Sequence, residues 1–598
     1  MGPHQTPTHV LFRQSLTTST AIAALLVGAL LLAGCDQKQD QAQTEAENGP
    51  APVTGRTAPT KDTPVTGVVR EEMEAADAAP PAPKQAPGES FRFSAGTREV
   101  DAQAPYPALP QPEVRDKFPN AKPNPVKLAS EEPVSTFSAD VDTASYTVVR
   151  KFLNDGALPP ADAVRIEEMV NYFDYSYALP ENRAQPFRPT VSVYQTPWNP
   201  DTQIVHIGIK GFDIQRNERP AANLVFLLDV SGSMDEPNKL PLVKKAMRML
   251  VNELDAKDRV SIVVYAGDAG MVLEPTSGAA KGKILAALDD LRPGGSTAGA
   301  EGIRQAYQLA HANFKKDGVN RVILATDGDF NVGITDPNQL EDFVARERES
   351  GITLTCLGFG VGNYNDALMQ KLAQKGNGNA AYIDTINEAR KVLVEQIGGT
   401  LFTIAKDVKF QIEFNPMRVS EYRLIGYETR LLNREDFNND KVDAGDIGAG
   451  HTVTALYEIV PAGSNGHLMD PLRYRAATPT QPSNASGEIA FLRMRYKLPN
   501  ESQSRLIERP VTDRDKIEDL RRASEDQRFA AAVAGFGQLL RNDPYMKNFG
   551  YKDVAELAGG AKGTDPFGYR TEFVQMVRLA QALPAIPALN QGGPGGEE

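Results

Sequence analysis

A short apolar run that ends abruptly in polar residues restricts the fold of this chain more than any other feature. It lies at residues 223–235, NLVFLLDVSGSMD. An apolar run bounded by a turn signal is typical of a buried parallel strand. Open α/β sheets bind ligands at the carboxyl ends of their strands. We therefore expect Asp229, Ser231 and Ser233 at such an edge, where their spacing by two would put them on one side of an extended loop.

Carboxylate and hydroxyl oxygens together suit a hard divalent cation, Mg²⁺ or Mn²⁺. Three such groups do not complete an octahedron, so further oxygens are expected from other strand ends. Thr297 lies in a glycine-rich loop, GGST, just before a predicted helix. Asp327 follows another apolar run, at residues 322–325. These two residues are the candidates to complete the set.

The five residues in this order resemble the metal-ion-dependent adhesion site of von Willebrand factor type A domains. That site combines a DxSxS motif with a distant Thr and a distant Asp, and Asp229, Ser231, Ser233, Thr297 and Asp327 match it. The resemblance implies that the three hydroxyls touch the metal and that the two carboxylates act mainly through water. It also implies a protein partner whose Asp or Glu carboxylate completes the coordination.

Other stretches resemble one subgroup, the YfbK-type bacterial von Willebrand A lipoproteins. They are LPLVKKAMRMLVNELDAKDRVSIVVYAG, the region 142–173 and DAGDIGAGHTV at residues 443–453. The resemblance covers about residues 135–580. It supplies a family but no particular partner.

Alternating strands and helices predict a doubly wound, Rossmann-like von Willebrand A domain at residues 220–404. Further buried strands are expected at residues 260–265, 321–325, 352–358 and 380–383. The helix after the motif carries Leu240, Val243, Met247, Leu250 and Leu254 at helical spacing, so one face should be buried. Cys356 lies in one of these strands without a neighbouring His or second Cys, which favours a small core residue.

The chain is long enough for several domains, and the segments around the α/β domain differ in pattern. We expect a helical segment at residues 131–185, strands at 186–219, a β-sandwich at 405–505, a helical region at 506–583 and a disordered tail at 584–598. The strands at 186–219 should join the sandwich, which makes the α/β domain an insertion. Trp198 is expected to be a packed anchor. Glu167 and Glu168 are expected on a solvated helix face.

Residues 1–35 are typical of a bacterial export signal, with an apolar core at 21–33 that is too short to span a bilayer. The core ends at Leu32-Ala33-Gly34-Cys35, which resembles a lipobox and predicts lipidation of Cys35. Asp36 resembles a signal for retention in the inner membrane, facing the periplasm, and the outer membrane remains open. Residues 36–130, rich in Pro, Ala and Gln, are predicted to be a disordered tether.

The formal net charge of −13 argues against a nucleic-acid surface. The sequence contains no P-loop, no HExxH motif and no histidine within the metal motif, so we expect a binding module rather than an enzyme. Two alternatives stay open. The chain could be an adaptor or scaffold for an envelope assembly or an AAA-type ATPase system. It could also be a Mg²⁺-dependent hydrolase, with Asp229 or Asp327 as the base.

Overall fold

The structure is a computed structural model, and it describes residues 117–119, 122–267, 269–295, 299–328, 337–360, 364–470 and 487–584. The predicted export signal with Cys35, the predicted tether before residue 117 and the tail after residue 584 lie outside these residues. None of the described helices is both long and apolar enough to cross a membrane.

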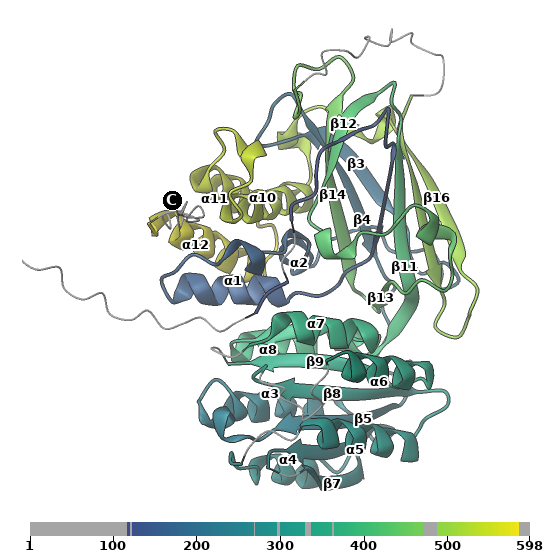
Figure 1. Cartoon of the computed structure of the whole chain (residues 1–598), viewed down its shortest axis with the longest axis vertical. Coiled ribbons are helices and arrows are strands. Elements are labelled where there is room, and N and C mark those ends of the chain that lie inside the picture. The colour runs from purple at the N-terminus through teal and green to yellow at the C-terminus, as the bar shows by residue number, and fades with distance from the viewer. Residues whose placement is uncertain are drawn as a thin grey trace, which may run out of the picture. The chain divides into compact units, whose positions relative to one another are not determined.

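The α/β domain is built on a six-stranded sheet with the order β10-β9-β8-β5-β6-β7 (Figure 1). The strands are β5 (Ala222–Asp229), β6 (Arg259–Tyr265), β7 (Ala269–Ser277), β8 (Val319–Thr326), β9 (Thr353–Phe359) and β10 (Ala380–Ile383). All pairs are parallel except β6 with β7. The predicted doubly wound fold is confirmed, and the antiparallel edge strand β7 is an addition to it.

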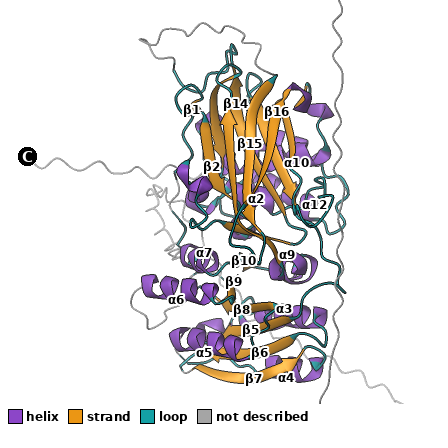
Figure 2. Cartoon of the chain, turned by 90° about the vertical axis from the view of Figure 1, so that its right-hand side faces the viewer, coloured by secondary structure: helices purple, strands orange, loops and turns teal. Residues whose placement is uncertain are grey.

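Helices cover both faces of this sheet, as Figure 2 shows, with α5 and α6 on one side and α3 and α4 on the other. The helices are α3 (Leu240–Glu253), α4 (Lys281–Asp289), α5 (Gly299–Ala312), α6 (Pro337–Glu349), α7 (Asp366–Lys375), α8 (Ile386–Arg390) and α9 (Ile397–Leu401), with a π-helical stretch, Lys391–Glu395, between the last two. Every residue of β5 is buried, because its side chains point alternately to the two faces of the sheet and each face is covered by helices. Phe226 packs with the α3 side, whereas Leu227 packs with the α5 side.

A β-sandwich is formed by strands from both sides of the α/β domain in the sequence. One sheet has the order β1 (Lys127–Leu128), β12 (Val419–Ile425), β14 (Thr452–Pro461), β4 (Gln203–Lys210), β3 (Thr190–Gln195) and β17 (Lys516–Ile517). The other has β13 (Gly445–Gly448), β11 (Thr403–Phe414), β15 (Glu488–Lys497) and β16 (Arg505–Thr512), with β2 (Val134–Ser138) paired to β11. Since β4 pairs with β14, the α/β domain is an insertion, as predicted.

Helices from the two ends of the described chain share one core. They are α1 (Ala144–Asn154), α2 (Ile166–Asn171), α10 (Glu525–Leu540), α11 (Tyr551–Gly559) and α12 (Tyr569–Ala582). Phe173 packs edge-on against Phe529 and Phe573 at centroid distances of 4.8 and 5.8 Å. Trp198, 2% exposed, belongs to the same core, which agrees with its predicted anchoring role.

Some expected boundaries are wrong. Strand β1 and the buried Val126 and Ala129 lie inside the range predicted to be tether, and β2 lies inside the range predicted to be helical. Residues 505–517 form β16 and β17, so the C-terminal helices begin only at Glu525. Charged residues on both faces of the partly exposed edge strand β16 concealed its alternation.

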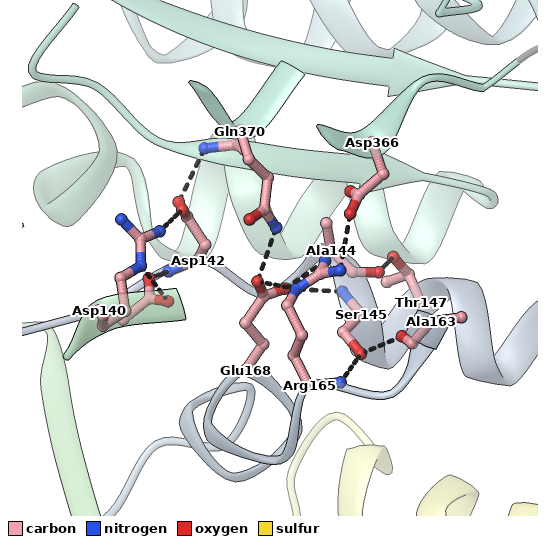
Figure 3. Close-up of polar contacts among 12 residues, drawn as sticks. Asp140, Asp142, Ala144, Ser145, Thr147, Ala163, Arg165, Glu168, Asp366 and Gln370 are labelled. Atoms are coloured by element: carbon pink, nitrogen blue, oxygen red, sulfur yellow. Dashed lines mark hydrogen bonds and ion pairs between the residues drawn. The ribbon is translucent and has the colours of Figure 1, made fainter. Parts of the chain in front are cut away.

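The predicted solvated position of Glu167 and Glu168 is also wrong, because both side chains are buried. Helix α2 is only 6 residues long, less than two turns, and it packs against α10 and β14. Glu168 pairs with Arg165 and accepts a hydrogen bond from Gln370 Nε2 at 2.6 Å (Figure 3). Asp142, just before α1, accepts hydrogen bonds from Arg430 and from the backbone N–H of Ala380, both at 2.8 Å.

Candidate metal-binding site

The DxSxS motif begins where β5 ends, and hydrogen bonds fold it into a compact turn. Ser231 N donates to Asp229 Oδ1 at 2.9 Å, and the hydroxyls of Ser231 and Ser233 lie 3.0 Å apart. Residues Gly232–Asp235 form a 3₁₀ turn, so the hydroxyls converge through this turn rather than through a fully extended loop. Asp229 and Ser231 are buried and Ser233 is exposed, which leaves the hydroxyl cluster open to solvent on one side.

Asp327 joins the motif because β5 and β8 are parallel neighbours and end at the same edge of the sheet. Thr326 Oγ1 donates to Asp229 Oδ2 at 3.1 Å and accepts a hydrogen bond from Gly328 N at 3.2 Å. Gly328 has φ +93°, a conformation that favours glycine. The second carboxylate oxygen of Asp229 is therefore held by the residue that directly precedes Asp327.

Lys239 is a member of this site that the sequence did not suggest. Its side chain is 4% exposed, and Nζ donates to Asp327 Oδ2 at 3.1 Å and to Ser233 O at 3.0 Å. Gly360, with φ +74°, makes room for it, since a Cβ there would lie 2.4 Å from Lys239 Cε. A lone lysine before an amphipathic helix carries no sequence signal of its own.

Thr297 lies outside the described residues. The glycine loop before it does reach the motif, because Gly232 N donates to Gly295 O at 3.1 Å and Gly294 N donates to Val230 O at 2.8 Å. Gly295 has φ +80°, and a Cβ there would lie 2.7 Å from Gly267 N. The structure thus brings together Asp229, Ser231, Ser233 and Asp327.

The oxygen atoms gathered at this site suit a cation. Burial raises the pKa of Asp229 to about 6, the hydrogen bonds from Ser231 and Thr326 lower it, and the charge of Asp327 raises it further. The donors are two carboxylates and two hydroxyls, the oxygen ligands that Mg²⁺ and Mn²⁺ prefer. No group of three His, Cys, Asp or Glu side chains that could hold a metal occurs in the described part of the chain. The residues present fit a hard divalent ion.

Comparisons with known proteins agree with this fold. Residues 223–396 match the family model of the von Willebrand factor type A domain, 112–206 match that described as von Willebrand factor, and 399–583 match that described as uncharacterized protein YfbK, C-terminal. The chain is 46% identical over 469 residues to the uncharacterized protein YfbK of Escherichia coli K12, covering 77% of this chain and 80% of that protein.

Two further comparisons cover less or are more distant. The uncharacterized protein sll0103 of Synechocystis is 32% identical over 173 residues, covering 29% of this chain and 40% of that protein. Among solved structures, a von Willebrand factor type A protein from Catenulispora acidiphila has 15% identity and a TM-score of 0.37, covering 68% of this chain and 91% of that one.

The parallel sheet, its two layers of helices and the motif at its carboxyl edge define a von Willebrand factor type A domain protein. Domains of this family commonly bind through a metal-dependent adhesion site and mediate protein–protein interactions. On the extent of its similarity to the Escherichia coli relative, the chain belongs to the YfbK family of bacterial proteins in this class.

Proposed function

We propose that this protein is a lipid-anchored binding module of the cell envelope, which holds a protein partner through a divalent cation. The observation that carries the proposal is the convergence of Asp229, Ser231, Ser233 and Asp327 at one edge of the sheet. The exposed Ser233 is the point at which a partner can approach.

The chain's own residues prepare this site for an anionic partner. Ser231 and Ser233 offer neutral hydroxyls, so they would leave a bound ion most of its positive charge. The carboxylate of Asp229 holds Ser231 in place by accepting a hydrogen bond from its backbone N–H. Thr326 in turn holds that carboxylate by donating a hydrogen bond from its hydroxyl. Mg²⁺ or Mn²⁺, when bound, supplies a positive charge that attracts a carboxylate of the partner. An Asp or Glu side chain would then complete the oxygen ligands.

A hydrolase would need a general base beside the metal, and histidine is the commonest such group. The four histidines in the described ranges serve elsewhere. Buried His206 contacts Tyr177 and Tyr194, exposed His311 and His467 pair with glutamates, and buried His451 packs on Gly399. This distribution supports binding over hydrolysis. An adaptor role in an envelope assembly would use the same metal-dependent contact.

Metal-dependent capture tests the binding function. The purified protein is incubated with an envelope extract in EDTA or in Mn²⁺, and captured proteins are identified by mass spectrometry. We expect one set of partners in Mn²⁺ that is absent in EDTA and absent with Ser231→Ala/Ser233→Ala. Asp235→Asn, an exposed residue beside the motif, is the matched control and should capture the same set. Identical capture with and without metal would refute the proposal.

The lipid anchor is supported by the apolar segment that ends at Cys35 and by Asp36 after it. We propose lipidation of Cys35 and attachment to the inner membrane, with the folded part in the periplasm. Growth with radiolabelled palmitate should label the wild-type protein and not Cys35→Ser. Fractionation of the two membranes then distinguishes retention in the inner membrane from export to the outer one, and an unlabelled wild-type protein would rule out the anchor.

A further inference from the structure

A cavity of about 400 Å³ lies away from the metal-binding site. Four parts of the chain line it: residues 173–176 after α2, Lys391 in the π-helical stretch after α8, residues 524–526 at the start of α10, and residues 563–570 that lead into α12. Its volume falls within the range of small-molecule sites. Because Lys391 belongs to the α/β domain and the other lining residues belong to the helical core, a ligand here would contact both.

Lys391, the first residue of the π-helical stretch, lines this cavity and is 2% exposed. Its Nζ lies 4.4 Å from the ring centroid of Tyr172 and 5.1 Å from that of Tyr569. Within the described ranges, Nζ has no hydrogen bond and no ion pair, and the nearby carboxylate of Glu388 interacts with it only through charge. The ring faces offset part of the cost of burying the ammonium, but they satisfy none of its three N–H donors by a conventional acceptor.

The neighbouring buried cations differ from Lys391 in this respect. Arg150 pairs with Asp384, Glu388 and Glu572, and Arg570 pairs with Asp526. π-Helical stretches are rare and occur frequently at functional sites. An anionic group in the cavity would give Lys391 the acceptor that these arginines already have.

The rest of the lining argues for a ligand with both charges. Arg570 and Asp526 also line the cavity but are paired with each other, whereas Asp174 and Glu525 are exposed and their carboxylates have no ion pair in the described part of the chain. A dianion such as phosphate would be repelled by these acids, and a simple cation would be repelled by Lys391. Two aromatic residues, Phe173 and Phe567, add apolar surface to the lining, and Phe567 is 52% exposed.

We propose that this cavity binds a small zwitterion of the amino-acid type. Its carboxylate pairs with Lys391, its ammonium pairs with Asp174 or Glu525, and its apolar stem packs on the two phenylalanines. The site is independent of the metal-binding edge, so it adds a small-molecule ligand to a protein whose proposed partner is another protein.

Calorimetric titration of the full-length protein with linear ω-amino acids, from 3-aminopropanoate to 8-aminooctanoate, tests the proposal. We expect one chain length to bind best. At that length, the carboxylic acid without the amine and the amine without the carboxylate should each bind at least about tenfold more weakly. Lys391→Met should abolish binding, whereas Lys371→Met, an exposed lysine of α7, should not change it.

Loss of binding in Lys391→Met could also come from misfolding, so a double substitution of the two exposed acidic residues provides the second test. Asp174→Asn/Glu525→Gln should weaken the zwitterion about tenfold and should not weaken the matched amine-free acid, whose carboxylate these two acids repel. The proposal fails if no member of the series binds. It also fails if Lys391→Met binds like the wild type, or if the double substitution has no effect on the zwitterion.

Discussion

The ammonium of Lys239 and the carboxylate of Asp327 are paired at 3.1 Å, and both side chains are almost fully buried. The pair lies where β8 ends, at the edge that carries the adhesion-site motif. Lys239 also holds the backbone of Ser233. The site therefore contains a cation of the protein's own, which shares a carboxylate with any metal that enters.

Lys239→Met should raise the affinity for Mn²⁺. A positive charge near the ion repels it and competes for Asp327, and its removal should tighten binding about tenfold by the Coulomb energy of nearby like charges. Manganese titration followed by electron paramagnetic resonance measures the dissociation constant directly. Lys245→Met, an exposed lysine of α3, is the control. Weaker binding in Lys239→Met would instead show that the lysine mainly holds the Ser233 turn in place.

Metal binding should strengthen as the pH rises through about 6. The raised pKa of Asp229 means that the metal-free folded protein keeps a proton that the unfolded chain loses near pH 3.8. This residue's contribution to stability therefore decreases as the pH rises from 3.8 to about 6. The metal needs the carboxylate form, and each pH unit below 6 should lower its affinity about tenfold. Melting with and without Mn²⁺ at pH 5, 6, 7 and 8 measures the effect. A stabilisation by Mn²⁺ that is equal at all four pH values would contradict it.

Asp366→Asn should loosen the α/β domain from the rest of the protein. Arg165 Nη1 and Asp366 Oδ2 form an ion pair at 2.7 Å without hydrogen-bond alignment, and both are buried (Figure 3). Removal of one partner of a buried pair costs roughly 3–5 kcal/mol. Differential scanning calorimetry of the variant should show either two separate unfolding transitions or unfolding at a lower Tm than in the wild type. Lys371→Met removes a long, 3.6 Å pair between Glu341 and an exposed lysine, and it should change the unfolding free energy by less than about 1 kcal/mol.

Glu167→Gln should remove a pH dependence of stability at alkaline pH. Burial, and then the charge of Glu428, raise the pKa of Glu167 to about 8, so the folded protein retains a proton that the unfolded chain loses near pH 4.5. Stability from this group is present at low pH and is lost as the pH rises to 8. At pH 9 the glutamine variant should therefore be more stable than wild type, on the order of a few kcal/mol. Denaturant unfolding at pH 5.5 and 9 tests this, with the exposed Glu301→Gln as control.

Much of the α/β domain follows from local pattern. An apolar run with a polar end, repeated with helices between, predicts a parallel sheet whose strand ends meet at one edge. That geometry alone accounts for the meeting of Asp229 with Asp327 across 98 positions of sequence, because β5 and β8 are neighbours. The insertion of this domain into the sandwich follows from strand order in the same way.

Which charged residues are buried depends on the tertiary structure and does not follow from local sequence pattern. Helical periodicity put Glu167 and Glu168 on a polar face, but α10 and β14 cover the short α2 helix, so both glutamates are buried. Lys239 became part of the metal site because Gly360, far away in sequence, leaves space for its stem. A sequence pattern records which face of an element is apolar, whereas the partner that neutralises a buried charge comes from whichever distant segment packs there.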